Sequence, residues 1–397
     1  MKDLSKLNDL FTESVIREMT RICDAAGGYN LSQGFPDFES PMEIKQAAVN
    51  AIMQGLNQYP ITFGEAELRE AVSVKARNFN GIICNPETDI TITCGATEAM
   101  MAVLKAIINP GDEIIIFEPF YENYGPDGIL SGATPRYVKL HTPSTMEGEW
   151  QIDPQELSAA FNDKTKAIII NTPNNPTGKI FTHGELRMIA DLCNKWDVYA
   201  ITDEIYEHIV YNGLKHISIG SYEDMRERTI TINSISKTYS VTGWRVGWAI
   251  ANEKITNGIR KVHDFLTVGA PTPLQHAAVT ALNFSEEYYV GLQERYLIAR
   301  KLLFDALVES GFKPYLPQGS YYIMTNVADW MKILKIESDF EFSRKLIELT
   351  GVATVPGFSF YSNKLDGRSQ VRFTFCKKME TLEIVRDKLI GLKDQFK

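Results

Sequence analysis

The chain of 397 residues has an ordinary globular composition, 44% hydrophobic and 23% charged, and a net charge of −9 without any basic block. These values argue against a nucleic-acid or membrane partner and favour a protein of two domains. Scattered cysteines without a CxxC pair, together with the lack of an apolar leader, predict a reduced cytoplasmic protein. Histidine spacing gives no support for a metal site, and the absence of G-x-G and Walker sequences excludes dinucleotide and NTP fingerprints.

From residue 89 onwards, short β-branched runs alternate with stretches whose apolar residues recur at helical spacing. Near-continuous apolar strands that alternate with helices are typical of a parallel sheet covered on both faces. We therefore predict an α/β fold whose large domain holds a mostly parallel seven-stranded sheet sandwiched by helices. The expected strands are 89–94, 113–117, 135–140, 167–171, 198–202, 229–233 and 245–251, and the expected helices are 96–108, 121–132, 153–161 and 184–196.

The last hundred residues change in character. Residues 286–311 predict a long amphipathic helix, and a mixed pattern of strands and helices follows it, which indicates a smaller α+β domain. The first forty-odd residues show no sheet pattern. We expect an N-terminal segment (1–45) that packs with the small domain, a large domain (46–287) and a small C-terminal domain (288–397).

Residues able to bind an anion or perform chemistry follow five of the expected strands. Ligands of open parallel sheets lie beyond the carboxyl ends of the strands, so five such ends on one edge predict a single site. The residues are Gly95, Ala96 and Thr97 after the first strand, "EPFYENY" (118–124) after the second, "TPNNPTG" (172–178), Asp203 with Glu204 and Tyr206, and Ser234, Ser236 and Lys237.

The chemistry of this set predicts a pyridoxal phosphate (PLP) site. Gly95, Ala96 and Thr97 open a helix, whose free N–H groups suit a phosphate. A helix end contributes only about 0.3–2 kcal/mol, so Arg245 and Ser234 would supply the remaining contacts. Lys237 could form a Schiff base with an aldehyde, and a nearby carboxylate could pair with the pyridine nitrogen.

Each of these residues also has a simpler interpretation when taken alone. Lys237 would be a solvated lysine at a strand end, Asp203 a helix N-cap, and Asn175 part of a turn. Arg372 would be a surface arginine, and Tyr121 and Tyr124 would be core aromatics. His208, His216 and His263 are interpreted as structural. The shared edge of the sheet is what favours the functional interpretation.

The segments "LSQGFPDF", "NTPNNPTGK", "ITDEIY" and "RTITINSISKTYSVTGWRVGW" resemble the class I/II aminotransferase family of fold-type-I PLP enzymes. They are most similar to its aspartate, aromatic and kynurenine/glutamine transaminase branch, from about residue 10 to the C-terminus. The resemblance implies that Lys237 forms the internal aldimine and moves the α-proton, and that Asp203 pairs with the ring nitrogen. It implies that Asn175 and Tyr206 donate to the phenolate and that Tyr121 stacks on the ring.

The same resemblance implies the remaining contacts. Ala96, Thr97, Ser234, Ser236 and Arg245 would hold the phosphate. Tyr59 would reach the phosphate of a neighbouring subunit, which implies a homodimer with composite sites. Arg372 and Gly34 would bind the substrate α-carboxylate, in the case of Arg372 through a planar fork suited to this group.

The substrate is less defined by the sequence. No second cation for a distal carboxylate is found at the matching places, and Val268 and Gly269 occupy the segment that would line the partner's pocket. We therefore favour an aromatic or neutral L-amino acid as donor and a 2-oxo acid such as 2-oxoglutarate as acceptor, with aspartate left open. A PLP-dependent C–S β-lyase and a non-catalytic PLP- or amino-acid-binding protein are the alternatives.

Two X-Pro bonds, Glu118-Pro119 and Asn175-Pro176, lie at strand ends that must aim a side chain at the ligand. We expect at least one of them to be cis.

Overall fold

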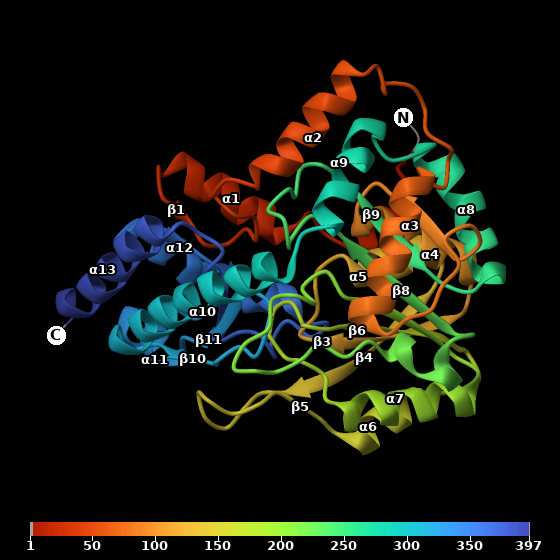
Figure 1. Cartoon of the computed structure of the whole chain (residues 1–397). Coiled ribbons are helices and arrows are strands. Elements are labelled where there is room, and N and C mark those ends of the chain that lie inside the picture. Colours follow the sequence, from red (N-terminus) through yellow and green to blue (C-terminus); the bar gives the residue numbers. More distant parts are fainter. Residues whose placement is uncertain (1–2, 397) are drawn as a thin grey trace.

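The computed structural model describes residues 3–396 (Figure 1). Within them, two main β-sheets of different size organise the chain, and β1 and β12 form a third, two-stranded sheet. The larger sheet has the order β2-β9-β8-β7-β6-β3-β4-β5. Strand β9 runs antiparallel to both of its neighbours and β5 runs antiparallel to β4, whereas the other pairs are parallel. Its strands are β2 (Ile90–Thr93), β3 (Glu113–Glu118), β4 (Thr134–His141), β5 (Gln151–Ile152), β6 (Thr165–Asn171), β7 (Tyr199–Asp203), β8 (Thr229–Ser234) and β9 (Gly247–Ile250).

The predicted mostly parallel sheet is confirmed, and the short edge strand β5 adds an eighth strand to the seven expected. Two residues are too few to show an alternating pattern, so the sequence gives no sign of β5.

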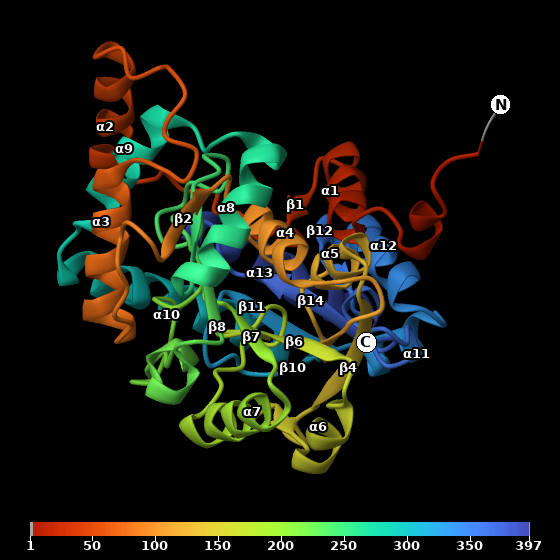
Figure 2. The same ribbon diagram turned by 90° about the vertical axis from the view of Figure 1, so that its right-hand side faces the viewer.

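The central strands are apolar because helices cover both faces of the sheet. In β3, Ile114 and Ile116 point into the core shared with α4 and α8, whereas Ile115 and Phe117 point into the core shared with α7. Figure 2 shows α2, α3 and α9 as a further group beside β2, at the edge of this body. The helices of the larger body are α2 (Met42–Met53), α3 (Ala66–Lys75), α4 (Ala96–Ile107), α5 (Tyr124–Ser131), α6 (Pro154–Ala160), α7 (His183–Trp196), α8 (Glu253–Thr267) and α9 (Thr272–Leu282).

The smaller body is built on an antiparallel sheet of order β10-β11-β14-β13. Its strands are β10 (Lys313–Pro314), β11 (Tyr322–Asn326), β13 (Val355–Pro356) and β14 (Gln370–Thr374). Its helices are α10 (Glu286–Glu309), α11 (Ala328–Leu334), α12 (Asp339–Thr350) and α13 (Met379–Gln395).

The N-terminal segment contacts the smaller body. Helix α1 (Val15–Ala25) packs against α12, and β1 (Tyr29–Asn30) pairs in parallel with β12 (Val352–Ala353). The division at residues 45 and 287 stays a prediction; α10 begins at Glu286, close to the second of these boundaries.

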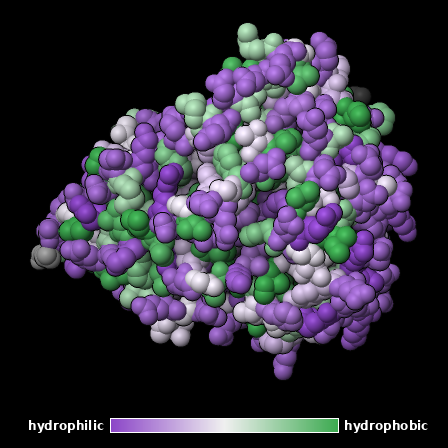
Figure 3. Space-filling view, in the orientation of Figure 1, coloured by the Kyte–Doolittle hydropathy of each residue, from purple (hydrophilic) through white to green (hydrophobic). Residues whose placement is uncertain are grey.

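Hydrophilic side chains cover most of the face seen in Figure 3, and apolar side chains occur there in small groups. Across residues 3–396, none of the helices combines the length and the apolar character that crossing a membrane would require. The prediction about the two X-Pro bonds is confirmed, because Glu118-Pro119 and Asn175-Pro176 are both cis, as is Thr172-Pro173.

Candidate active site

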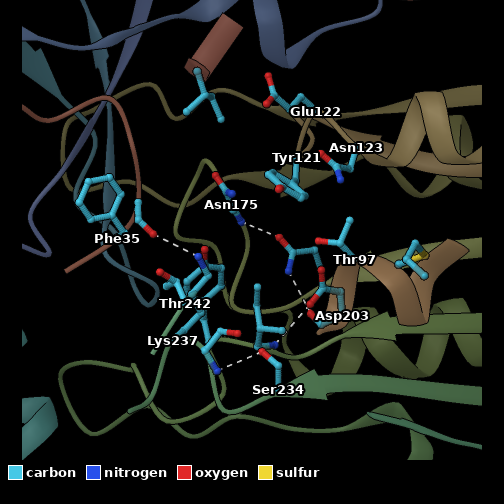
Figure 4. A pocket seen from close by; sticks show the side chains of 18 of the residues that line it. Phe35, Thr97, Tyr121, Glu122, Asn123, Asn175, Asp203, Ser234, Lys237 and Thr242 are labelled. Atoms are coloured by element: carbon cyan, nitrogen blue, oxygen red, sulfur yellow. Dashed lines mark hydrogen bonds between the residues drawn. The ribbon is translucent and has the colours of Figure 1, made fainter. Parts of the chain in front are cut away.

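A cavity of about 440 Å³ lies at the carboxyl ends of β6, β7 and β8 and at the N-terminus of α4. Side chains from the smaller body and from the N-terminal segment complete its wall. Twelve of the predicted site residues line it: Gly34, Ala96, Thr97, Tyr121, Asn175, Asp203, Tyr206, Ser234, Ser236, Lys237, Arg245 and Arg372. Figure 4 shows Thr97, Asp203, Ser234 and Lys237 converging from separate segments on one space.

Two predicted residues lie elsewhere. Gly95 is the N-cap of α4, with φ of 82°, and a Cβ there would collide with the guanidinium of Arg245. A glycine is therefore required for Arg245 to approach the helix end. Tyr59 does not line the cavity and is 85% exposed.

The N-terminus of α4 and its neighbours form a cradle for an anion. The first N–H groups of a helix have no intrahelical acceptor, and here Ala96 and Thr97 face the cavity. The buried Ser236 Oγ has no hydrogen-bond partner within residues 3–396. Arg245 uses Nη1 to donate to the Thr242 carbonyl at 2.9 Å, which fixes the guanidinium beside the cradle. Backbone donors, a hydroxyl and a guanidinium together suit a phosphate.

Asp203, at the end of β7, is a buried carboxylate held by a tyrosine. Tyr124 Oη donates to Asp203 Oδ2 at 2.6 Å. Burial raises the pKa of Asp203 to about 6, although the hydrogen bond from Tyr124 and the charge of Lys237 act in the opposite direction. The carboxylate would gain from a cationic partner in the cavity, such as a protonated ring nitrogen.

Tyr124 was interpreted from the sequence as a core aromatic, and its bond to Asp203 was missed. The only available signal was its position three residues after Tyr121, in the segment that follows β3.

Lys237 places an amine near the centre of the cavity. Its Nζ donates to the Gly34 carbonyl at 3.1 Å. Burial, assisted by the charges of Arg245 and Arg372, lowers the pKa of Lys237 to about 8. A larger fraction of neutral amine near pH 7 makes Lys237 a better nucleophile and base than a surface lysine.

Arg372, on β14 of the smaller body, is fully buried and faces the same space. Nη1 donates to Asn175 Oδ1 at 2.8 Å and Nη2 to the Ser32 carbonyl at 2.6 Å, and the buried Nε has no partner among the described residues. The guanidinium lies 4.1 Å from the ring centre of Tyr322. Such a pre-oriented fork suits a carboxylate.

Gly34 and Tyr206 complete this side of the cavity. A Cβ at Gly34 would collide with the hydroxyl of Tyr322, so only glycine permits this approach. Tyr206 Oη lies 3.1 Å from Tyr322 Oη and is buried. Tyr321 lies outside the lining and donates to the Gly34 carbonyl at 2.9 Å.

The mouth of the cavity contains two charged residues to which the sequence gave no individual role, although Glu122 lies in the segment 118–124 expected at the site. Glu122 follows Tyr121, and Arg17 is part of α1; both line the cavity. Ser14, the N-cap of α1, also lines it. The sequence pattern could not place α1 at the mouth, because nothing in residues 1–45 specifies where this segment packs.

The histidines interpreted as structural lie outside the cavity. His208 is buried between the rings of Phe79 and Tyr289, at centroid distances of 4.0 and 4.2 Å. Burial lowers the pKa of His208 to about 3. His216 Nε2 lies 2.9 Å from Glu204 Oε2, in a buried network behind Asp203.

The family model described as aminotransferase class I and II matches residues 26–389. The chain belongs to this family. Members use PLP as cofactor and catalyse amino-group transfer.

Similar proteins of this aminotransferase family carry different substrates in their names. The kynurenine–oxoglutarate transaminase of Dictyostelium discoideum is 35% identical over 98% of this chain and 96% of its own length. The methionine aminotransferase of Escherichia coli is 33% identical, with 97% of both chains covered. The structure of N-succinyldiaminopimelate aminotransferase from Mycobacterium tuberculosis is 34% identical, has a TM-score of 0.93 and covers 98% of this chain and 100% of that chain.

The residues of the cavity fit PLP. The cradle that a Cβ at Gly95 would fill can hold a phosphate. The unpartnered hydroxyl of Ser236 can donate a hydrogen bond to it. Lys237 offers an amine for an aldehyde, and Asp203 offers a carboxylate for a ring nitrogen.

Proposed function

We propose that this aminotransferase moves the α-amino group of an aromatic or neutral L-amino acid to a 2-oxo acid such as 2-oxoglutarate, in a ping-pong reaction. The observation that carries the proposal is the convergence of Lys237, Asp203 and Arg372 on one cavity beside an anion cradle. When bound, PLP supplies an aldehyde for the amino group and a protonated ring that draws electrons from the substrate's Cα–H bond.

The chain's own residues divide the remaining work. Lys237 Nζ takes up the α-proton of the amino acid, which its pKa of about 8 permits near neutral pH. Asp203 keeps the ring nitrogen protonated by pairing with it. Arg372, oriented by Asn175 and the Ser32 carbonyl, binds the α-carboxylate and fixes the position of Cα relative to Lys237.

The preference for aromatic or neutral donors is supported by the wall of the cavity. Ile16, Phe35, Tyr121 and Tyr322 line it together with polar residues. Phe35 offers an aromatic ring to a substrate side chain, whereas Tyr121 would stack on the ring of the cofactor. The cations that line the cavity are Arg17, Lys237, Arg245 and Arg372. The roles proposed here already use the last three, so aspartate is disfavoured because only Arg17, at the mouth, is left for a distal carboxylate.

We also propose that the protein works as a homodimer in which Tyr59 reaches the partner's phosphate site. Tyr59 and Phe265 are 85% and 93% exposed, which is unusual for aromatic side chains. They lie on connected segments, since Thr272 Oγ1 donates to the Gln58 carbonyl at 2.7 Å. A second copy would bury both rings.

The decisive experiment is reconstitution of the purified protein with PLP, followed by a donor panel with 2-oxoglutarate. We expect yellow absorbance and amino transfer in the wild type, and neither in Lys237→Ala. Phenylalanine, methionine and glutamine should exceed aspartate in kcat/KM. Release of ammonia and pyruvate from a cysteine S-conjugate, without any acceptor and faster than transfer, would instead indicate the lyase.

A further inference from the structure

The mouth of the cavity holds a carboxylate that none of the roles above uses. Glu122 is half-buried and lines the cavity directly after Tyr121. Figure 4 shows Glu122 and Asn123 at the end of the cavity far from Ser234, where the anion cradle lies. A ligand whose phosphate sits in the cradle would therefore leave this end to the substrate.

Helix α1 fixes the position of this carboxylate. Ser14 Oγ donates to Glu122 Oε1. Ser14 Oγ also accepts a hydrogen bond from the backbone N–H of Arg17 at 3.3 Å. A serine that caps a helix has few accessible rotamers, so it holds Glu122 in place. The second oxygen, Oε2, has no hydrogen-bond partner among the described residues and remains able to accept one.

The charge of Glu122 is only partly compensated, because its carboxylate pairs with no cation among the described residues. Of the other residues that line the cavity, Gln33 and Asn123 are neutral and Ile16 is apolar. Arg17 is the cation nearest in sequence to the Ser14 cap, but it is exposed, and water screens its charge. The free oxygen of Glu122 therefore discriminates between substrate groups that donate a hydrogen bond and groups that carry a negative charge.

We propose that Glu122 determines substrate specificity: it favours side chains that end in an amide or amine N–H over side chains that end in a carboxylate. The inference rests on the proposed function, because Arg372 would bind the α-carboxylate and the aldehyde of PLP would take the amino group, which directs the third substituent of Cα along the remaining wall. Glutamine, for example, would be a better donor than glutamate, which has nearly the same shape.

The test compares binding of succinamate and succinate to the PLP-loaded protein by titration calorimetry. The two ligands differ only in that an amide replaces one carboxylate. We expect the wild type to bind succinamate more tightly, and Glu122→Gln to reduce the ratio of the two affinities by about fivefold, as expected for one like charge near the surface. The amide in this variant can still accept the bond from Ser14, so α1 should stay in place.

Glu13→Gln is the matched control, because it removes a carboxylate one residue from Ser14 that pairs with Arg21 and does not line the cavity. It should leave the affinity ratio at the wild-type value. An unchanged ratio in Glu122→Gln, or an equal change in Glu13→Gln, would overturn the proposal.

A second measurement separates this inference from the proposed function. The kcat/KM for glutamine relative to glutamate should fall in Glu122→Gln by a factor similar to that of the binding ratio. If succinamate binds more tightly than succinate but no donor transfers its amino group in the wild type, the proposed function fails. The preference of Glu122 for an amide over a carboxylate is then still supported.

Discussion

The bond between Tyr124 and Asp203 gives the sharpest prediction of this structure. Both side chains are buried, and Tyr124 Oη lies 2.6 Å from Asp203 Oδ2. Tyr124→Phe removes this donor without changing the ring. We expect the carboxylate to lose part of the stabilisation of its charged form, which raises the pKa of Asp203 above its present value of about 6.

The size of the effect follows from the strength of such a bond. A hydrogen bond to a charged group contributes about 1.5–3 kcal/mol, and one pKa unit corresponds to about 1.4 kcal/mol. The pH at which the Asp203 carboxyl takes up a proton should therefore move up by about 1–2 pH units in the variant. A larger fraction of the carboxyl would then be protonated near neutral pH and would pair poorly with the pyridine nitrogen.

The assay is a PLP titration of the cofactor-free protein, followed by its yellow absorbance, from below the pKa of Asp203 to above that of Lys237. Affinity should fall as the pH drops through the pKa of Asp203, so the acid limb of the profile should move to higher pH in Tyr124→Phe. The control is Tyr137→Phe, at a half-buried tyrosine outside the cavity, which should keep the wild-type profile. An acid limb at the wild-type midpoint in Tyr124→Phe would refute the reasoning.

Two further predictions concern substrate binding and acid stability. Arg372→Lys loses the planar fork, so kcat/KM for α-amino acids should fall by about 10- to 150-fold. The kcat/KM for an amine without a carboxylate should change little. Equal losses for both substrates would contradict the assigned role. His208 has a folded pKa of about 3 against 6.5 for the free side chain, so the unfolded state binds more protons between these values and stability is lost as the pH falls below 6.5. Between pH 7 and 5, the free energy of unfolding measured with urea should fall by about 2 kcal/mol more in the wild type than in His208→Phe. Equal losses in the two proteins would show that His208 does not contribute.

The sequence was sufficient for the parts of the site that depend on the parallel sheet. Asn175, Asp203 and Lys237 follow neighbouring strands, and the carboxyl ends of parallel strands meet at one edge whatever their loops do. Gly95 follows β2, but Arg245 precedes the antiparallel β9, so its place beside the phosphate was expected from its charge and from the family resemblance. The resemblance to a family added Arg372, which lies in a different sheet and which no strand pattern could have brought to this edge.

Other parts depended on packing that the sequence does not specify. Tyr124 bonds Asp203 because the chain between Tyr121 and α5 turns inwards, and this turn has no periodic signal. Ser14, Arg17 and Glu122 meet because α1 crosses to the mouth of the cavity, a path set by its contacts with α12 and β12. Long-range placement of an irregular segment is not encoded in local spacing.

The guanidinium of Arg372, which is expected to bind the substrate carboxylate, has a consequence for synthesis of the protein. Arg372 bonds the carbonyl of Ser32 across 340 positions of the chain. A ribosome must therefore release nearly the entire polypeptide before these two ends can meet. A nascent chain could complete the sheet and the anion cradle earlier, so its capture of a vitamin would precede any ability to recognise an amino acid.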